Sequence, residues 1–308
     1  MIAGEPQPNL DFYSGLLGMR LVKVSVNQDD PETFHFFYGN ATGAPGSDLT
    51  FFPYRNARQG KLGPGMVSRI DLLMPKDSLD FWRNRFAEFA VHWDETVDRF
   101  GVPGIDFRDP DGLNLRMIEG AEGPGGSWDG MPVPAEFCFL RTIGVEIAAF
   151  PQIMDGKSSK SGSFIEAHLG FEMQEDDHEI ARYNAADGSY VDIVRSDALE
   201  RGIGGAGTVH HVAFRAENDA EQAEAHVKLV AANANVSPII DRLWFQSIYF
   251  REPGGVLFEI ATDGPGFTKD EAFENLGTRV SLPPWLEPQR ERIEASLPRI
   301  QLPTGVKR

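Results

Sequence analysis

The chain has 308 residues, of which 41% are hydrophobic, and its 29 basic and 46 acidic residues give a net charge of −17. This length allows a substantial buried core in one or two domains. The acidic balance argues against a nucleic-acid backbone or an anionic membrane as partner. No apolar run approaches the ~18 residues of a membrane span, and the start does not resemble a signal peptide. The single cysteine, Cys138, excludes an internal disulfide, so we expect a cytoplasmic protein.

Two short helices are predicted at equivalent places in the two halves of the chain. They are DFYSGLLGMRL at residues 11–21 and SFIEAHLGFEM at residues 163–173. Each is amphipathic and is ended by a glycine, which adopts the left-handed conformation of a helix C-terminus cheaply. Ser163 and Glu166 predict a capping box at the start of the second helix.

A second repeated pattern is a strand followed by a helix. VSRIDLLMP at 67–75 and VHHVAFRAE at 209–217 predict strands, and apolar residues at helical spacing follow at 79–89 and 223–230. Further strands are predicted at residues 34–39, 48–54, 181–195 and 248–250.

These elements predict an α+β fold of four βαβββ units in two tandem modules, with curled mixed sheets around a cavity. The first module covers residues 1–120, and a Gly- and Pro-rich linker covers residues 121–136. The second module covers residues 137–265, and residues 266–308 form a C-terminal extension in which prolines prevent a long helix.

One repeated stretch differs between the modules by the sign of a charge. FRDPDGLNLRMIEG at 107–120 and FREPGGVLFEIATD at 250–263 align so that Arg116 falls opposite Glu259. Strand alternation places Glu259 on the less bulky face of its strand, next to a small alanine. His211 occupies the same kind of position in its own strand. We therefore expect His211 and Glu259 to face one cavity, and the neighbouring His210 to point away from His211.

A histidine and a carboxylate that face one cavity are two of the three ligands of a non-haem Fe(II) site. The alternative is that His211 and Glu259 form an ordinary polar pair. The corresponding residues of the first module are Arg69 and Arg116, which would repel a cation. The metal hypothesis thus predicts one site per chain, in the second module. The alternative for the two arginines is a structural role, with Asp71 or Asp109 as partner.

The whole pattern resembles the vicinal oxygen chelate superfamily, which includes glyoxalases, bleomycin resistance proteins and extradiol dioxygenases. It is most similar to the two-module ring-cleaving dioxygenases that act on hydroquinones. The stretches that carry the resemblance include DFYSGLLGMRLVKVSVNQDDPETFHFFYGN, DLTFFPY, GTVHHVAF, DRLWFQSIYFREPGGVLFEIATDGPGF and LGTRVSLPPWLEPQR. They extend over nearly the whole chain.

The resemblance implies roles for particular residues. His211 and Glu259 match two iron ligands, whereas His210, Arg242 and Tyr249 match residues close to the substrate. The other histidines match no ligand position, and we expect them to be surface or locally bonded residues: His35, His92, His168, His178 and His226.

The third iron ligand of this family lies on the opening strand, just before the segment that matches residues 2–7. Met1 falls a few residues past that position, so we expect the first strand and its histidine to be absent from this chain. We favour a reading frame that begins too late over a lost ligand, because the other family features are present. As written, the chain should bind iron weakly, since affinity depends on the number of ligands.

The resemblance predicts an Fe(II)-dependent extradiol-type dioxygenase that takes part in the degradation of aromatic compounds. Its substrate would be a hydroquinone or a related dihydroxylated aromatic, into which both atoms of O2 are inserted. Mn(II) is the alternative ion. The expected partners are this small aromatic substrate and O2, without nucleic acid or membrane, and a homo-oligomer is left open. Two other functions on the same fold are a glyoxalase-like metal-dependent isomerase and a non-catalytic protein that binds small molecules.

Overall fold

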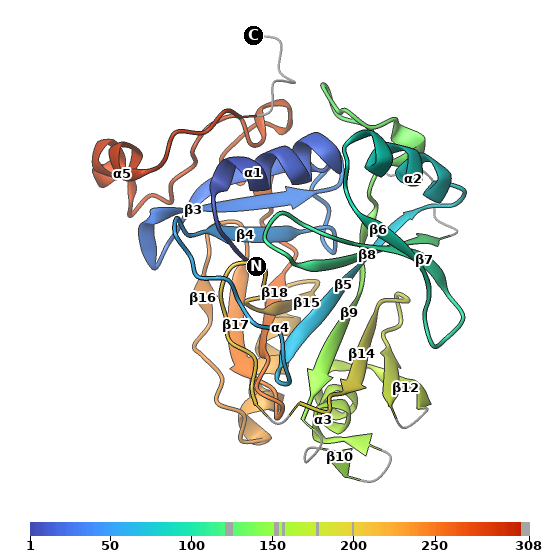
Figure 1. Cartoon of the computed structure of the whole chain (residues 1–308). Coiled ribbons are helices and arrows are strands. Elements are labelled where there is room, and N and C mark those ends of the chain that lie inside the picture. The colour runs from blue at the N-terminus through green and yellow to red at the C-terminus, as the bar shows by residue number, and fades with distance from the viewer. Residues whose placement is uncertain (121–125, 151–153, 156–157, 177–178, 199, 303–308) are drawn as a thin grey trace.

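The computed structural model describes residues 1–120, 126–150, 154–155, 158–176, 179–198 and 200–302. It consists of mixed β-sheets with few helices (Figure 1). Four units repeat one sheet order, in which the first strand of the unit lies beside its last strand. The predicted α+β fold of four βαβββ units is therefore confirmed.

The first unit forms a separate sheet in the order β1-β4-β3-β2. Its elements are β1 (Ile2–Ala3), α1 (Pro6–Leu10), the π-helical η1 (Asp11–Leu16), β2 (Arg20–Asn27), β3 (Asp30–Gly39) and β4 (Leu49–Pro53). The expectation that the first strand is absent is therefore wrong, because a short β1 is present and pairs in parallel with β4.

The second and third units share one eight-stranded sheet in the order β12-β13-β14-β9-β5-β8-β7-β6. The second unit contains β5 (Met66–Pro75), α2 (Leu79–Glu88), β6 (Trp93–Val97), β7 (Pro103–Arg108) and β8 (Asn114–Gly120). The third contains β9 (Arg141–Ala149), the hairpin β10 (Met154–Asp155) and β11 (Ser158–Ser159), α3 (Lys160–Leu169), β12 (Glu172–Asp176), β13 (Ile180–Asn184) and β14 (Tyr190–Arg195). The antiparallel pair β5 and β9 joins the two units.

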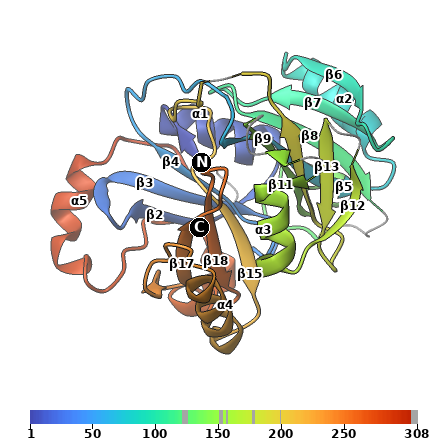
Figure 2. The same ribbon diagram turned by 90° about the horizontal axis from the view of Figure 1, so that it is seen from below.

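The fourth unit forms a sheet in the order β15-β18-β17-β16. Its elements are β15 (Val212–Ala216), α4 (Asp219–Ala231), β16 (Ile240–Asp241), β17 (Gln246–Arg251) and β18 (Leu257–Thr262). This sheet lies beside the sheet of the first unit (Figures 1 and 2). The backbone N–H of Ile2 donates to the carbonyl of Thr208 at 2.9 Å and ties the two together.

The units therefore associate in space in an order that differs from their order in the chain. The first unit pairs with the fourth, and the second with the third. The division of the chain into modules 1–120 and 137–265 stays a prediction about sequence. The first part of the predicted linker, residues 121–125, lies outside the described residues, and the 3-10 turn η2 (Ala135–Phe137) forms its end.

Helix boundaries depart from the sequence prediction where another residue makes the cap. α3 begins earlier than expected, because the hydroxyl of Ser159 accepts from the N–H of Gly162 at 2.8 Å. The predicted capping box at Ser163 and Glu166 is therefore wrong. Gly170, at φ 73°, ends the helix as predicted. The first helix also begins earlier, at Pro6, a residue favoured in the first turn.

The C-terminal extension packs against the first sheet through short helical turns. These are η4 (Phe267–Lys269), η5 (Phe273–Asn275), η6 (Glu287–Gln289) and α5 (Arg290–Ser296). The fully buried Lys23 of β2 holds the extension, because its ammonium contacts Asp270 at 2.8 Å and also Glu271. In the described part of the chain, no helix is long and apolar enough to cross a membrane.

Substitution of Lys23 by methionine should lower the free energy of unfolding by about 3–5 kcal/mol, because the carboxylate of Glu271 loses its buried cation and keeps only the exposed Arg279. Urea unfolding followed by circular dichroism measures this change. The matched control is Lys228→Met on α4, where only a solvent-exposed pair with Glu224 is lost and the stability should hardly change. Equal effects of the two substitutions would contradict a stabilising role for the buried pair.

Candidate functional site

The centre of the site is a close pair of side chains on neighbouring strands of the fourth unit. His211 lies just before β15, and Glu259 lies on β18, where it pairs with Ala213. The Nε2 atom of His211 is 2.9 Å from Oε2 of Glu259. The Glu259 side chain is 4% exposed and that of His211 is 14% exposed, so the pair is shielded from bulk water. The contact shows that the two side chains lie together, and the cavity that both were expected to face stays a prediction.

Hydrogen bonds hold the Glu259 carboxylate in place. The hydroxyl of the fully buried Ser247 donates to Oε1, and Tyr249 lies directly opposite Glu259 in the β17–β18 ladder. Burial alone would raise the pKa of Glu259, but His211 and the hydrogen bonds from Ser247 and Tyr249 hold that pKa below its usual range. The carboxylate is therefore ionised at neutral pH and suited to bind a cation.

His210 lies beside His211, and the prediction that it points away is wrong. The two Nδ1 atoms are 2.8 Å apart. Strand alternation does not apply here, because β15 begins only at Val212. Partial desolvation and the neighbouring His211 lower the pKa of His210 to about 4, so its ring is neutral at pH 7. One of the two rings must then donate through Nδ1 and the other accept.

Arg242 and Tyr249 complete the predicted set. The Nε of Arg242 donates to the phenolic oxygen of Tyr249 at 3.3 Å, and the guanidinium carbon is 5.4 Å from the centre of the same ring. The Tyr249 ring is 6.0 Å from that of His211. Burial and the charge of Glu259 raise the pKa of Tyr249 far above neutrality, so the phenol keeps its proton. The structure thus brings all five predicted site residues together.

Three further side chains of this region were not predicted from the sequence. Ser247 has the same strand parity as Tyr249, and alternation along β17 would have revealed it. Phe52 and His35 come from the first unit, and the Phe52 ring is 5.9 Å from that of His210. Only the pairing of the first and fourth units brings them to the site.

The remaining histidines have local contacts or lie outside the described residues. His92 lies 3.6 Å from Asp94, and His168 packs on the ring of Phe164. The Nε2 of His226 is 3.2 Å from the carbonyl oxygen of Ser237. His178 is outside the described residues. These contacts agree with the expectation for His92, His168 and His226.

The donor atoms of His211 and Glu259 fit two positions of a metal site. Neighbouring ligands with bonds of about 2.1 Å at right angles are ~3 Å apart, close to the 2.9 Å observed between Nε2 and Oε2. The Nδ1 of His211 is held by His210, as the second nitrogen of a metal-binding histidine usually is held by a partner. Within the described ranges, no three His, Cys, Asp or Glu side chains are grouped to hold a metal ion. The fit is therefore to two ligands of a larger set.

The corresponding place in the eight-stranded sheet is filled by ion pairs. Arg116 pairs with Asp71 in the β5–β8 ladder as Glu259 pairs with Ala213, so the two sites have the same register. Six charged contacts form the network: Arg69–Asp71 at 2.7 Å, Arg69–Glu146 at 3.0 Å, Arg116–Asp98 at 3.3 Å, Arg116–Asp106 at 3.7 Å, Arg182–Asp98 at 3.0 Å and Arg182–Asp192 at 2.7 Å. The structural alternative for Arg69 and Arg116 is thereby supported, with Asp71 as one partner. Asp109 instead accepts from the Tyr13 hydroxyl at 3.1 Å.

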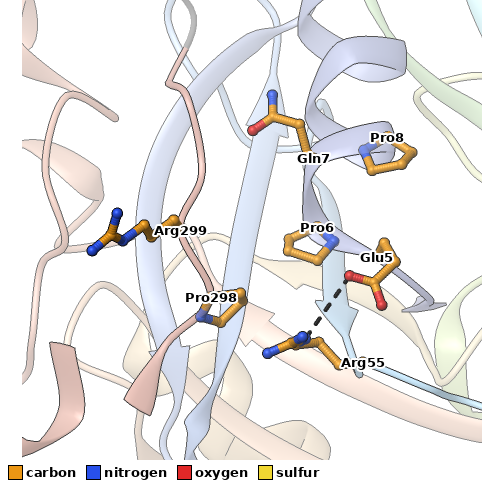
Figure 3. Close-up of a pocket in the computed structure, with 7 residues that line it drawn as sticks. All are labelled: Glu5, Pro6, Gln7, Pro8, Arg55, Pro298 and Arg299. Carbon is orange, nitrogen blue, oxygen red and sulfur yellow. Dashed lines mark ion pairs between the residues drawn. The ribbon is translucent and has the colours of Figure 1, made fainter. Parts of the chain in front are cut away.

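The surface of the protein has two hollows that bear on the location of the site. One, of about 200 Å³, borders His210 and includes Arg201 and Arg251 in its lining. The larger, of about 400 Å³, lies at the start of α1, where Arg55 approaches Glu5 at 3.9 Å (Figure 3). None of the residues described as lining this larger hollow belongs to the site around His211, so only the smaller hollow adjoins the candidate chemistry.

Comparison with known proteins identifies the family of the chain. The sequence pattern of the Glyoxalase/Bleomycin resistance protein/Dioxygenase superfamily matches residues 1–117 and 149–260. The chain therefore belongs to this superfamily, and the resemblance noted in the sequence is confirmed.

Individual relatives match almost the whole chain. It is 40% identical to the "Putative ring-cleaving dioxygenase MhqO" of Bacillus subtilis (strain 168), over 96% of this chain and 93% of that protein. It is 32% identical to the chlorohydroquinone/hydroquinone 1,2-dioxygenase of Sphingobium indicum, over 94% of this chain and 91% of the relative. A crystal structure described as a "putative dioxygenase" from Bacillus subtilis superposes with a TM-score of 0.90 at 38% identity, covering 98% of this chain and 95% of that one.

Replacement of Arg116 by methionine should lower the free energy of unfolding by about 3–5 kcal/mol, because Asp98 and Asp106 would lose a buried cation. The same substitution should leave metal binding at His211 and Glu259 unchanged, because the network lies in the eight-stranded sheet and these two residues belong to the fourth unit. Urea unfolding and metal content after dialysis measure the two effects. A variant that loses metal while it keeps its stability would contradict a purely structural role for Arg116.

Proposed function

We propose that the protein is an Fe(II)-dependent extradiol-type dioxygenase that cleaves the ring of a hydroquinone or a related dihydroxylated aromatic and inserts both atoms of O2. The observation that carries the proposal is the shielded pair of His211 and Glu259, whose nitrogen and oxygen donors suit this ion. The name of the Sphingobium indicum relative supports the substrate class. Mn(II) is the alternative ion, and a cytoplasmic location and a homo-oligomer stay predictions.

His211 and Glu259 would hold the ion through Nε2 and one carboxylate oxygen. When bound, Fe(II) would lower the pKa of the substrate phenol and place it beside O2. The described residues supply two of the three ligands that the family resemblance predicts.

The chain's own residues can then handle protons and charge. His210 is neutral, so it can accept a proton from a phenolic hydroxyl near His211. Tyr249 keeps its proton and can donate a hydrogen bond to an oxygen that becomes negative. Arg242, which contacts the Tyr249 oxygen, can stabilise the same anionic charge. All three contributions follow from positions held by the fourth unit.

The direct test is oxygen uptake with hydroquinone after loading of the protein with Fe(II) under anaerobic conditions. We expect one O2 consumed for each ring cleaved. Glu259→Gln should lower iron content and oxygen uptake by about 100-fold or more, because an amide is a poorer ligand than a carboxylate. The matched control is Glu252→Gln, a buried glutamate that caps the turn after β17 through Gly254 and Val256 and should not change iron content.

Other outcomes would favour the alternative functions. Absence of oxygen uptake on every hydroquinone and catechol tested would contradict the dioxygenase proposal. Isomerisation of a hemithioacetal by the metal-loaded protein would then indicate a glyoxalase-like enzyme. A protein that binds small aromatics but takes up no iron, manganese or zinc would indicate a non-catalytic binding protein.

Tyr249→Phe should lower kcat for ring cleavage, calculated per bound iron, on the order of 100-fold, because the variant loses the phenolic hydroxyl. Steady-state oxygen uptake together with iron analysis measures both quantities. Tyr54→Phe, which removes a hydroxyl that accepts from Asn27 at 2.9 Å, is the matched control. Equal kcat values for Tyr249→Phe and the unmodified protein would contradict the proposed role.

A further inference from the structure

His35 is a histidine of the first unit that faces the site formed by the fourth unit. It lies on β3, where alternation puts His35 and Phe37 on one face of the sheet. Phe37 packs against Trp244 of the fourth unit, with ring centres 5.5 Å apart. The opposite face of β3 packs on the first helix, since Tyr38 stacks with Tyr13 at 5.2 Å. His35 therefore lies on the face that looks toward the fourth unit.

Aromatic contacts connect His35 to the site. Its ring is 3.9 Å from that of Phe37 and 4.1 Å from that of Phe52. The ring of Phe52 is in turn 5.9 Å from that of His210. Burial lowers the pKa of His35 well below its usual range, and the N-terminal amine of Met1 and the guanidinium of Arg242 lower it further. His35 is thus a neutral imidazole held between two rings at the edge of the site.

The Nε2 atom of His35 is inaccessible to water and has no hydrogen-bond partner among the described residues. A polar atom buried without a partner is unfavourable, and such atoms in native proteins commonly indicate a missing water or ligand. The neighbouring rings of Phe37 and Phe52 offer no strong acceptor or donor. A ligand that enters between the first and fourth units can supply one.

We propose that His35 binds the substrate oxygen that lies farther from the His211–Glu259 pair, and thereby selects rings with a hydroxyl para to the reacting one. The proposal rests on the proposed function for the choice of ring. A 1,4-dihydroxybenzene carries oxygens at opposite ends of its ring. When one oxygen lies at the His211–Glu259 pair of the fourth unit, the other points toward a different wall of the site. The first unit provides that wall, and the Nε2 atom of His35 on it has no hydrogen-bond partner in the described part of the chain. A site built to bind a hydroxyl discriminates strongly against analogues that lack it.

The test compares the binding of hydroquinone and 4-methylphenol, which differ in the para group, by calorimetry with the iron-loaded protein in the absence of O2. The unmodified protein should bind hydroquinone at least about tenfold more tightly. His35→Phe should weaken hydroquinone binding about tenfold and change 4-methylphenol binding by less than about twofold. His35→Gln, which keeps hydrogen-bonding groups, should retain part of the preference. His168→Phe, a histidine on α3 that also packs on a phenylalanine, is the matched control.

Equal weakening of both ligands in His35→Phe, or a preference that survives in this variant, would overturn the assignment. Melting temperatures of the variants show whether the fold is intact, and His35→Gln serves if the phenylalanine variant does not fold. The two proposals can fail separately. A protein that consumes no O2 but loses its para-hydroxyl preference in His35→Phe would contradict only the dioxygenase proposal. A protein that cleaves hydroquinone and keeps its preference in His35→Phe would contradict only the role of His35.

Discussion

The antiparallel pairing of β5 with β9 is the constraint on which the rest of the structure depends. It joins the second and third units edge to edge, so the first unit is left to meet the fourth, where Ile2 of β1 bridges to Thr208 shortly before β15. The site is consequently built from the two ends of the chain. His211 and Glu259 come from the fourth unit, whereas Phe52 and His35 come from the first.

The eight-stranded sheet and the pair formed by the first and fourth units have the same fold but differ in what occupies the matching positions. In the eight-stranded sheet, the positions that match the ligands hold arginines, and acidic side chains neutralise them in a buried network. Such a network fills the space between strands and is disrupted if one partner is removed. In the pair of first and fourth units, the same positions hold a histidine and a carboxylate, whose nitrogen and oxygen atoms suit a cation. In this duplicated fold, one half thus carries a stabilising ion-pair network and the other half carries the candidate site.

Much of the site could be predicted from the sequence because strand alternation is a local property. The parity of Glu259 followed from β18 alone, whereas Tyr249 was chosen by family resemblance and its position opposite Glu259 depends on the turn between β17 and β18. His210 was placed wrongly because β15 begins after it, and a strand boundary cannot be read from a short apolar run. The capping box at Ser163 failed for a similar reason, since Ser159 starts α3 one turn earlier.

The sequence by itself determined the four repeated units, the opposite charges of Arg116 and Glu259, and the face of the strand that each occupies. These properties depend on period-two alternation and on aligned repeats, which are visible in a linear chain. The tertiary structure alone decided which units associate, and with them the positions of Phe52 and His35 at the site. Contacts between residues far apart in the chain depend on how sheets pair and pack, and neither is encoded in any short stretch of residues.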